Sequence, residues 1–319
     1  MERQAQHVIL LGASGTIGRA TLSRLCAEGY RVTCLTRQPL ELPAVVSQIA
    51  VDFSDPAATH AAVGRLRADA ILSCMASRTG RAREAWSVDH RAHLHVLEAA
   101  KAAGIGQFVL LSAICVQKPY LEFQRAKLAF EGALQLSKLN WSIVRPTAFF
   151  KSLSGQIKRV QAGKPFLVFG DGTLTACKPI SDADLATYLV GCLQDTERKG
   201  RILPIGGPGP ALTPRAQGEL IFDLLGQPAR FRKVPVALMD GIIGVLGGLG
   251  RVSAGMADKA EFARIGRYYA TESMLVWDST AGRYDADATP EFGTDRLEAH
   301  YAALIAGDAE VGLGAHAMF

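Results

Sequence analysis

The stretch "HVILLGASGTIGRA" (residues 7–20) decides the fold of this chain. An apolar, β-branched run ends at Gly12, and a segment with helical spacing follows over 16–29. Glycines at such a turn let the backbone approach a pyrophosphate, while the helix N-terminus offers N–H groups and its positive dipole end. A glycine triplet alone is a weak signal, and its alternative is a tight structural turn; here it has the required strand–turn–helix context. The stretch predicts a nucleotide-binding turn that uses Gly12, Ser14, Gly15, Thr16, Ile17 and Gly18.

The alternation of strand and helix continues for about 130 residues. Buried strands are predicted at 30–37, 47–55, 69–77, 107–113 and 141–146, and long helices at 83–104 and 121–137. Continuous apolar strands that alternate with helices indicate a parallel sheet covered on both faces. We therefore expect an α/β fold with a doubly wound, mainly parallel sheet of the Rossmann type.

The rhythm changes after Pro146, where stretches rich in Gly and Pro appear, such as "GKPFLVFGDGTL" (163–174) and "IGGPGPALTP" (205–214). A further strand is predicted at 200–206, and "KPISDADLA" (178–186) indicates a helix that begins at an Asp cap. We expect residues 1–150 to form the nucleotide-binding domain. Residues 151–319 should form a smaller, mixed C-terminal region that completes the sheet edge and builds a substrate pocket.

The end of the second strand indicates which cofactor is bound. An acidic residue there would hold the 2′-hydroxyl of the NAD ribose, but the strand ends "CLTRQP" and the nearest acid is Glu41. Thr36 and Arg37 stand at this position, and an Arg can make charge-assisted bonds to a 2′-phosphate. NADP(H) is therefore favoured over NAD(H), the alternative being that Arg37 is simply exposed.

Ligands of open α/β sheets bind beyond the carboxyl ends of the strands. We therefore expect the cofactor to contact residues at the ends of the later strands as well. These residues are Asp52, Phe53, Cys74, Met75, Ala76, Ser112, Arg145, Pro146 and Thr147.

The composition excludes several function classes. The 319 residues are 49% hydrophobic and 20% charged, with a net charge of +5 that is spread along the chain, so no nucleic-acid footprint is indicated. Six scattered cysteines without a C-x-x-C argue against zinc and iron–sulfur sites, and we expect no metal. "DHRAHLH" (89–95) does not have zinc-protease spacing, and its histidines, His90, His93 and His95, are interpreted as mostly solvated. No G-x-S-x-G supports a hydrolase.

The seven residues before the apolar run of the first predicted strand are too few for a signal or transit peptide, so we expect no targeting segment and a reducing cytosol as the compartment. The most apolar later stretch, "PVALMDGIIGVLGGLG" (235–250), carries Asp240 and is too short to span a bilayer. It predicts a buried helix or pocket wall. Peripheral association with a membrane surface is the alternative.

The stretch "YLEFQRAK" (120–127) resembles the Tyr-x-x-x-Lys pair of short-chain dehydrogenases/reductases, except that Phe123 stands where the Tyr would be. The resemblance implies that Lys127 holds the nicotinamide ribose; an exposed helical Lys is the alternative. Tyr120 lies seven residues before Lys127, so both could share a helix face if the helix already includes Tyr120. The proton donor is therefore Tyr120, Lys127 or water.

Longer stretches carry a more specific resemblance. "LLGASGTIGRA", "QFVLLSAICVQKPYLEFQRAKLAFE", the stretch 140–182 and "IGGPGPALTP" are similar to the NADPH-dependent divinyl (proto)chlorophyllide 8-vinyl reductases, which are atypical short-chain reductases. The resemblance covers about residues 7–305, and it implies a tetrapyrrole substrate and NADPH. The resemblance implies a transit peptide in the plant relatives; since we expect none here, a bacterial cytosolic form is expected.

The implied reaction explains the missing phenol. Ketone reduction develops charge on one oxygen, whereas a vinyl group has no such oxygen and makes less demand on a fixed acid. The protein would supply orientation and an apolar pocket, with Phe123, Phe149 and Phe150 as candidate walls. A non-catalytic NADP(H)-sensing protein and another ene or isoflavone-type reductase remain alternatives; the sequence leaves the oligomeric state open.

Overall fold

The computed structural model describes residues 6–250 and 253–308. The strands are β1 (His7–Leu11), β2 (Arg31–Thr36), β3 (Ser47–Ala50), β4 (Ala70–Ser73), β5 (Gln107–Leu111), β6 (Asn140–Pro146), β7 (Phe166–Phe169), β8 (Arg201–Ile205), β9 (Phe231–Val234), β10 (Val276–Asp278) and β11 (Arg283–Asp285). The α-helices are α1 (Thr16–Ala27), α2 (Pro56–Gly64), α3 (Ala82–Ala85), α4 (His93–Ala102), α5 (Glu122–Leu136), α6 (Phe150–Leu153), α7 (Ile157–Gln161), α8 (Asp182–Gly191), α9 (Pro214–Leu224), α10 (Val236–Leu249), α11 (Ala254–Thr271) and α12 (Leu297–Ala306). A π-helix, η1 (Trp86–Ala92), precedes α4, and two short 3₁₀ turns are η2 (Ile114–Gln117) and η3 (Thr196–Arg198).

Seven strands form one sheet in the order β3-β2-β1-β4-β5-β6-β8. All pairings from β3 to β6 are parallel, with registers such as Ile9 opposite Thr33 on one side and Ile71 on the other. The connection from β3 to β4 carries the chain from one half of the sheet to the other. The strand order therefore reverses between the neighbouring strands β1 and β4, the switch point where such sheets bind ligands. The predicted doubly wound Rossmann-type sheet is confirmed.

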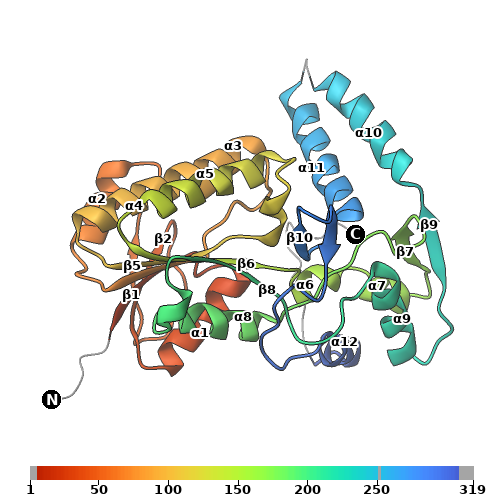
Figure 1. Cartoon of the computed structure of the whole chain (residues 1–319), viewed down its shortest axis with the longest axis horizontal. Coiled ribbons are helices and arrows are strands. Elements are labelled where there is room, and N and C mark those ends of the chain that lie inside the picture. Colours follow the sequence, from red (N-terminus) through yellow and green to blue (C-terminus); the bar gives the residue numbers. More distant parts are fainter. Residues whose placement is uncertain (1–5, 251–252, 309–319) are drawn as a thin grey trace. The chain divides into compact units, whose positions relative to one another are not determined.

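Helices cover both faces of this sheet, with α1 and α8 on one side and α2, α4 and α5 on the other (Figure 1). The central strands are mostly apolar because both faces are covered, and β1, β4 and β5 are buried at every position, whereas the edge strand β3 is mostly exposed. The α2, α4 and α5 side forms a core cluster in which Val96, Phe108 and Phe130 are almost fully buried. The result is a rigid frame for the residues at the strand ends.

The predicted helix over 83–104 contains an irregularity that the sequence did not reveal. Residues Trp86–Ala92 form a π-helix, in which each turn is wider than in an α-helix. His93, interpreted as solvated, is buried, with Nε2 2.8 Å from Ser73 Oγ and Nδ1 2.9 Å from the carbonyl oxygen of Val88. That interpretation of His93 was wrong, because the wide turns rotate this side chain toward the sheet.

The chain contacts divide the structure into two units rather than at a single boundary. The first unit contains the chain up to Ser77, residues 83–146 and residues 182–203. The second contains residues 78–82, 147–181 and the chain from Pro204 on. The chain therefore leaves the first unit after Pro146 and returns to it with α8 and most of β8.

The second unit has its own hydrophobic core. Phe150, Val160, Phe222 and Tyr301 from α6, α7, α9 and α12 are buried in it, together with residues of β7. Two small sheets, a parallel pair of β7 and β9 and an antiparallel pair of β10 and β11, complete the regular structure. This core is assembled from short elements, which explains why no long period was visible in the sequence.

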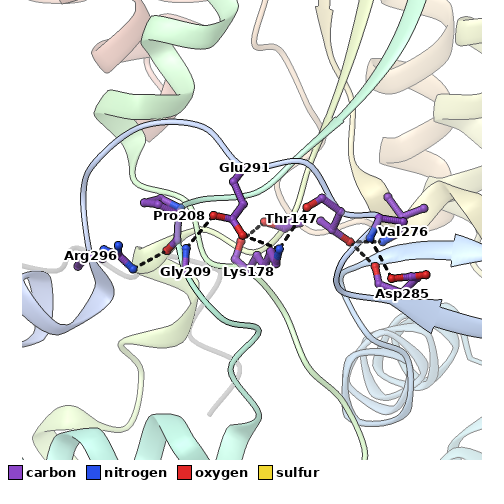
Figure 2. A network of polar contacts seen from close by, with 10 residues as sticks. Thr147, Lys178, Pro208, Gly209, Val276, Asp285, Glu291 and Arg296 are labelled. Carbon is purple, nitrogen blue, oxygen red and sulfur yellow. Dashed lines mark hydrogen bonds and ion pairs between the residues drawn. The ribbon is translucent and has the colours of Figure 1, made fainter.

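A buried lysine organises the polar centre of the second unit (Figure 2). Lys178 is 6% exposed, and its Nζ lies 2.6 Å from Glu291 Oε1 and 3.3 Å from the carbonyl oxygen of Thr289. Thr147 donates to the carbonyl oxygen of Lys178, and Gly209 N–H donates to Glu291 Oε2 over 3.0 Å. The network ties together four segments that are far apart in sequence, around residues 147, 178, 209 and 290.

Helix α10 departs from the expectation for residues 235–250. A buried helix or pocket wall was predicted, but none of its residues is buried, and Leu238, Ile242, Val245 and Leu249 are exposed. The helix packs against α11 on one side, where Asp240 pairs with Arg267. The prediction of burial was wrong because apolar composition does not reveal how many faces of a helix are covered by other elements of the fold.

Within the described residues, no helix has the length and hydropathy that crossing a bilayer requires.

Candidate cofactor and active site

The turn between β1 and α1 is shaped by close backbone contacts. Gly12 has φ of +79°, and a Cβ there would lie 2.5 Å from the backbone carbon of Cys74. A Cβ on Gly18 would lie 2.0 Å from the carbonyl oxygen of Gly12. Both positions therefore need glycine.

The start of α1 is suited to an anion. Gly15 is the N-cap, no side chain caps the helix, and no acidic residue lies in its first turn. Ser14 and Gly15 are exposed, Thr16 is half-buried, and Ile17 and Gly18 are buried. The exposed part of the turn can therefore meet a pyrophosphate, while Ile17 anchors the helix in the core.

The end of β2 fits a dinucleotide that carries a 2′-phosphate. Thr36 Oγ1 is buried and has no hydrogen-bond partner within the described structure, which leaves a polar atom for a ligand. Arg37, the next residue, is exposed, and no acidic side chain is paired with it in the described part of the chain. Together with the glycine turn, these groups fit a nicotinamide dinucleotide, and Arg37 fits its phosphorylated form.

The ends of β3 and β4 place the remaining predicted residues differently. Asp52 is exposed, and hydrogen bonds from the N–H and Oγ of Ser54 lower the pKa of its carboxyl. Phe53 packs in the core and its carbonyl oxygen lies 2.9 Å from His95 Nδ1. Cys74 and Met75 are half-buried and Ala76 is exposed. Burial raises the pKa of the Cys74 thiol to about 12, so this cysteine stays protonated at neutral pH.

Lys127 is held by a buried carboxylate that the sequence did not single out. Its Nζ lies 3.0 Å from Asp89 Oδ1, and the side chains are 13% and 0% exposed. Asp89 also accepts hydrogen bonds from Ser77, through N–H over 3.2 Å and through Oγ over 2.5 Å. The alternative that Lys127 is an ordinary exposed lysine is wrong.

A second buried carboxylate, Glu131, lies one helical turn beyond Lys127 on α5. It accepts a hydrogen bond from Ser112 Oγ over 2.5 Å and pairs with the guanidinium of Arg145, whose Nε is 3.2 Å away. Ser112 and Arg145, both predicted to contact the cofactor, are thus joined to each other through Glu131. The i, i+4 spacing of Lys127 and Glu131 was the signal that could have found it.

A small cavity lies between these groups, and its lining includes Asp89, His93, Ser112 and Lys127. Burial lowers the pKa of His93 to about 4, so the imidazole facing this cavity is neutral at physiological pH. Lys127 is therefore the basic side chain in the lining of the cavity, with a carboxylate beside it.

The two aromatic residues of the 120–127 stretch have different surroundings. Phe123 is on α5 and 8% exposed, whereas Tyr120 is 60% exposed and precedes the helix, whose N-cap is Leu121. Tyr120 has the ammonium of Lys118 5.6 Å from its ring centroid. The argument that Tyr120 and Lys127 share a helix face therefore does not hold, because Tyr120 is outside the helix.

The residues after β6 belong to the second unit. Pro146 ends the strand, Thr147 bonds to the carbonyl of Lys178, and Phe149 forms a bridge with Ile180. Phe150 is buried in the core of the second unit, whereas Phe123 belongs to the first unit. The structure therefore brings together Lys127, Ser112 and Arg145, and it places the predicted aromatic walls on two separate units.

Comparisons with known proteins show which family the chain belongs to. A family model described as NAD(P)H-binding matches residues 12–196. The divinyl chlorophyllide a 8-vinyl-reductase of rice (Oryza sativa subsp. indica) is 49% identical over 93% of this chain and 78% of its own. That of Arabidopsis thaliana is 43% identical over 94% of this chain and 76% of its own.

The fold also matches a solved structure, the Bordetella bronchiseptica enzyme WbmH in complex with NAD⁺. The TM-score is 0.65 at 17% identity, over 94% of this chain and 97% of that one, so the likeness concerns the fold. The glycine turn and the matching family model establish that the chain binds a nicotinamide dinucleotide, as predicted. By the extent and identity of these matches, the chain belongs to the NAD(P)H-binding family and to the divinyl chlorophyllide a 8-vinyl-reductases.

Proposed function

We propose that the chain reduces the 8-vinyl group of divinyl chlorophyllide or divinyl protochlorophyllide to an ethyl group, with NADPH as the reductant. Family membership supports this reaction. The observation that carries the proposal is the buried Phe123 four residues before an ion-paired Lys127. The site keeps a lysine but has no phenol beside it, which suits a substrate that develops no charge on a single oxygen.

The side chains have separate tasks in this reaction. NADPH, when bound, supplies a hydride. The β1–α1 turn holds the pyrophosphate, Arg37 the 2′-phosphate and Lys127 the nicotinamide ribose. Phe123 keeps that part of the site apolar. Orientation of the reacting carbons is the main contribution of such a site.

The proton that completes the reduction comes from Lys127 or from water. His93, which lines the same cavity as Lys127, is a poor source, because burial lowers the pKa of its imidazole to about 4. Tyr120 lies outside the helix and is 60% exposed. A lysine whose ammonium is fixed by a carboxylate retains two further N–H donors for a ligand.

The proposal is tested by incubation with NADPH and divinyl chlorophyllide, while the Soret band is recorded and the pigments are separated by chromatography. A blue shift with formation of the monovinyl product is expected. Divinyl protochlorophyllide serves as the second substrate. Tight NADPH binding without turnover of either pigment would favour the sensor protein, and turnover of another enone would favour a different ene reductase.

Arg37→Ala should weaken NADPH binding and leave NADH binding nearly unchanged. Loss of a charge-assisted hydrogen bond costs about 1.5–3 kcal/mol, which is about 10- to 150-fold in the dissociation constant. The two dissociation constants are measured by nicotinamide fluorescence. Arg65→Ala, which removes an exposed arginine at the end of α2, is the control for net charge. Equal losses for both cofactors in Arg37→Ala would rule out a 2′-phosphate contact.

We also propose that α10 rests on an anionic lipid surface. Leu238, Ile242, Val245 and Leu249 are spaced by four, three and four residues, which places them on one helix face, and all four are exposed. Exposed Arg232 and Lys233 precede the helix and complement acidic headgroups. An apolar helix face next to basic residues is typical of peripheral membrane association.

Ile242→Asp combined with Val245→Asp should abolish co-sedimentation with vesicles of phosphatidylglycerol and phosphatidylcholine. Each buried aliphatic side chain contributes about 1.5–3 kcal/mol, so the loss of two should lower the affinity by more than about 100-fold. Leu136→Asp, at an 88% exposed leucine on α5, is the matched control and should sediment like the wild type. If the wild type fails to bind vesicles but self-associates through this face, the lipid proposal is wrong.

A further inference from the structure

Asp89 connects two parts of the site that come from different elements. It lies on η1, and its carboxylate receives three donors: Ser77 N–H and Ser77 Oγ, and the ammonium of Lys127 on α5. Ser77 directly follows Cys74, Met75 and Ala76, the segment predicted to line the dinucleotide. One side chain therefore links the cofactor-lining segment to the lysine.

The π-helix fixes where Asp89 lies. Trp86 at the start of η1 donates from Nε1 to Glu122 Oε2 over 2.9 Å, which ties η1 to the first turn of α5. At the other end, His93 is close to the carbonyl of Val88 and to Ser73. Both ends of η1 are thus anchored, and π-turns of this kind are frequent at functional sites.

The charge on Asp89 calls for an explanation beyond packing. A neutral Asn could accept the hydrogen bonds from Ser77, whereas a fully buried carboxylate carries a large desolvation penalty. Lys127 is the partner that offsets the penalty, and the pair costs the fold more than a neutral contact would. The advantage of a carboxylate over a neutral Asn at this position is therefore its effect on the charge and position of the Lys127 ammonium.

We propose that Asp89 is a positioning residue that acts through Lys127. It keeps the ammonium charged and takes one of its N–H groups, so two N–H groups are left for a ligand at the small cavity that both residues line. When the dinucleotide binds along residues 74–77, the same carboxylate sets the distance between that segment and the ammonium. This inference rests on the proposed function for its catalytic part but not for its cofactor-binding part.

The test is a double-mutant cycle of Asp89→Asn and Lys127→Ala. Asp89→Asn alone should slow single-turnover vinyl reduction by about 100-fold and raise the NADPH dissociation constant by about tenfold. In the Lys127→Ala background the same change should have almost no further effect, because residues that act through one another are not additive. Equal factors in both backgrounds would show a merely structural role and overturn the proposal.

Two further variants keep the test decisive. Glu98→Gln removes a carboxylate from an exposed pair with Lys101 on α4 and should change neither readout. If Asp89→Asn does not fold, as judged by thermal unfolding, Asp89→Glu keeps the charge and moves it by one methylene. It should unfold near the wild-type temperature and show a smaller loss of the same kind; a wild-type rate and affinity would contradict the proposal. The double-mutant cycle can also be measured with the NADPH dissociation constant alone, which needs no pigment. This part of the test remains valid even if the proposed reaction is not observed.

Discussion

A variant with alanine in place of Gly18 should lose measurable NADPH binding and unfold at a lower temperature than the wild type. The new Cβ would lie 2.0 Å from the carbonyl oxygen of Gly12 and 2.7 Å from its carbonyl carbon. Both obstacles are backbone atoms, so the turn itself has to move. Forced overpacking typically costs about 1–3 kcal/mol in stability, and the displaced turn can no longer receive a pyrophosphate.

Gly132→Ala is the matched control for this prediction. Gly132 lies inside α5, and a Cβ there would meet nothing within 4 Å. Alanine is the better helix former by about 0.5–1 kcal/mol, so this variant should be as stable as the wild type or more so. Thermal unfolding and NADPH titration of both variants decide the matter. Wild-type affinity in Gly18→Ala would show that the turn does not hold the cofactor.

Lys127→Ala is expected to lower the single-turnover rate of vinyl reduction by about 10²–10⁴, the range typical of a lost proton donor or positioning group. The substitution removes the ammonium that lies 3.0 Å from Asp89 and leaves that carboxylate buried without its cation. Thermal unfolding measured alongside separates lost chemistry from lost fold. A rate near that of the wild type at saturating NADPH would remove Lys127 from the mechanism.

Substitutions of Phe123 and Tyr120 test whether the site works without a phenol and whether Tyr120 is the proton donor. Phe123→Tyr should not speed up the reaction, because the new hydroxyl enters a buried position and costs about 1–3 kcal/mol if it finds no partner. Tyr120→Phe would lower the rate by about 10²–10⁴ if Tyr120 were the acid. Its 60% exposure instead favours a change within about twofold, as for other surface substitutions. A markedly faster Phe123→Tyr would contradict a site built without a phenol.

The sheet could be predicted from the sequence because its central strands are buried on both faces. Runs such as "HVILLG" and "QFVLLSA" are mostly apolar, and the glycines that follow β1 stand in a strand–turn–helix context. The second unit could not be predicted in the same way. Its core joins short helices to small two-stranded sheets, and its polar centre pairs Lys178 with a residue more than a hundred positions away. No local pattern encodes such a pairing.

Local sequence patterns predicted part of the candidate site. They did not predict the residues whose role depends on a side chain that is distant in sequence. Gly12 and Gly18 were identified from their spacing, and Lys127 from its resemblance to the lysine of short-chain reductases. Asp89 and Glu131 were missed because a carboxylate on a helix normally indicates a solvated face. The interpretation of His93 as solvated failed because the π-turns of η1 change which residues of the following helix face the sheet.

The discontinuity of the first unit affects how the chain can fold while it is being made. Six strands of the sheet are complete once Pro146 has left the ribosome, but the edge strand begins at Arg201. At about 5–20 residues per second, the intervening segment takes about 3–11 s to synthesise. For that time the outer edge of β6 offers unpaired backbone groups, which is a template for wrong pairing with another nascent chain. Synthesis speed across residues 147–200 should therefore influence the yield of folded protein.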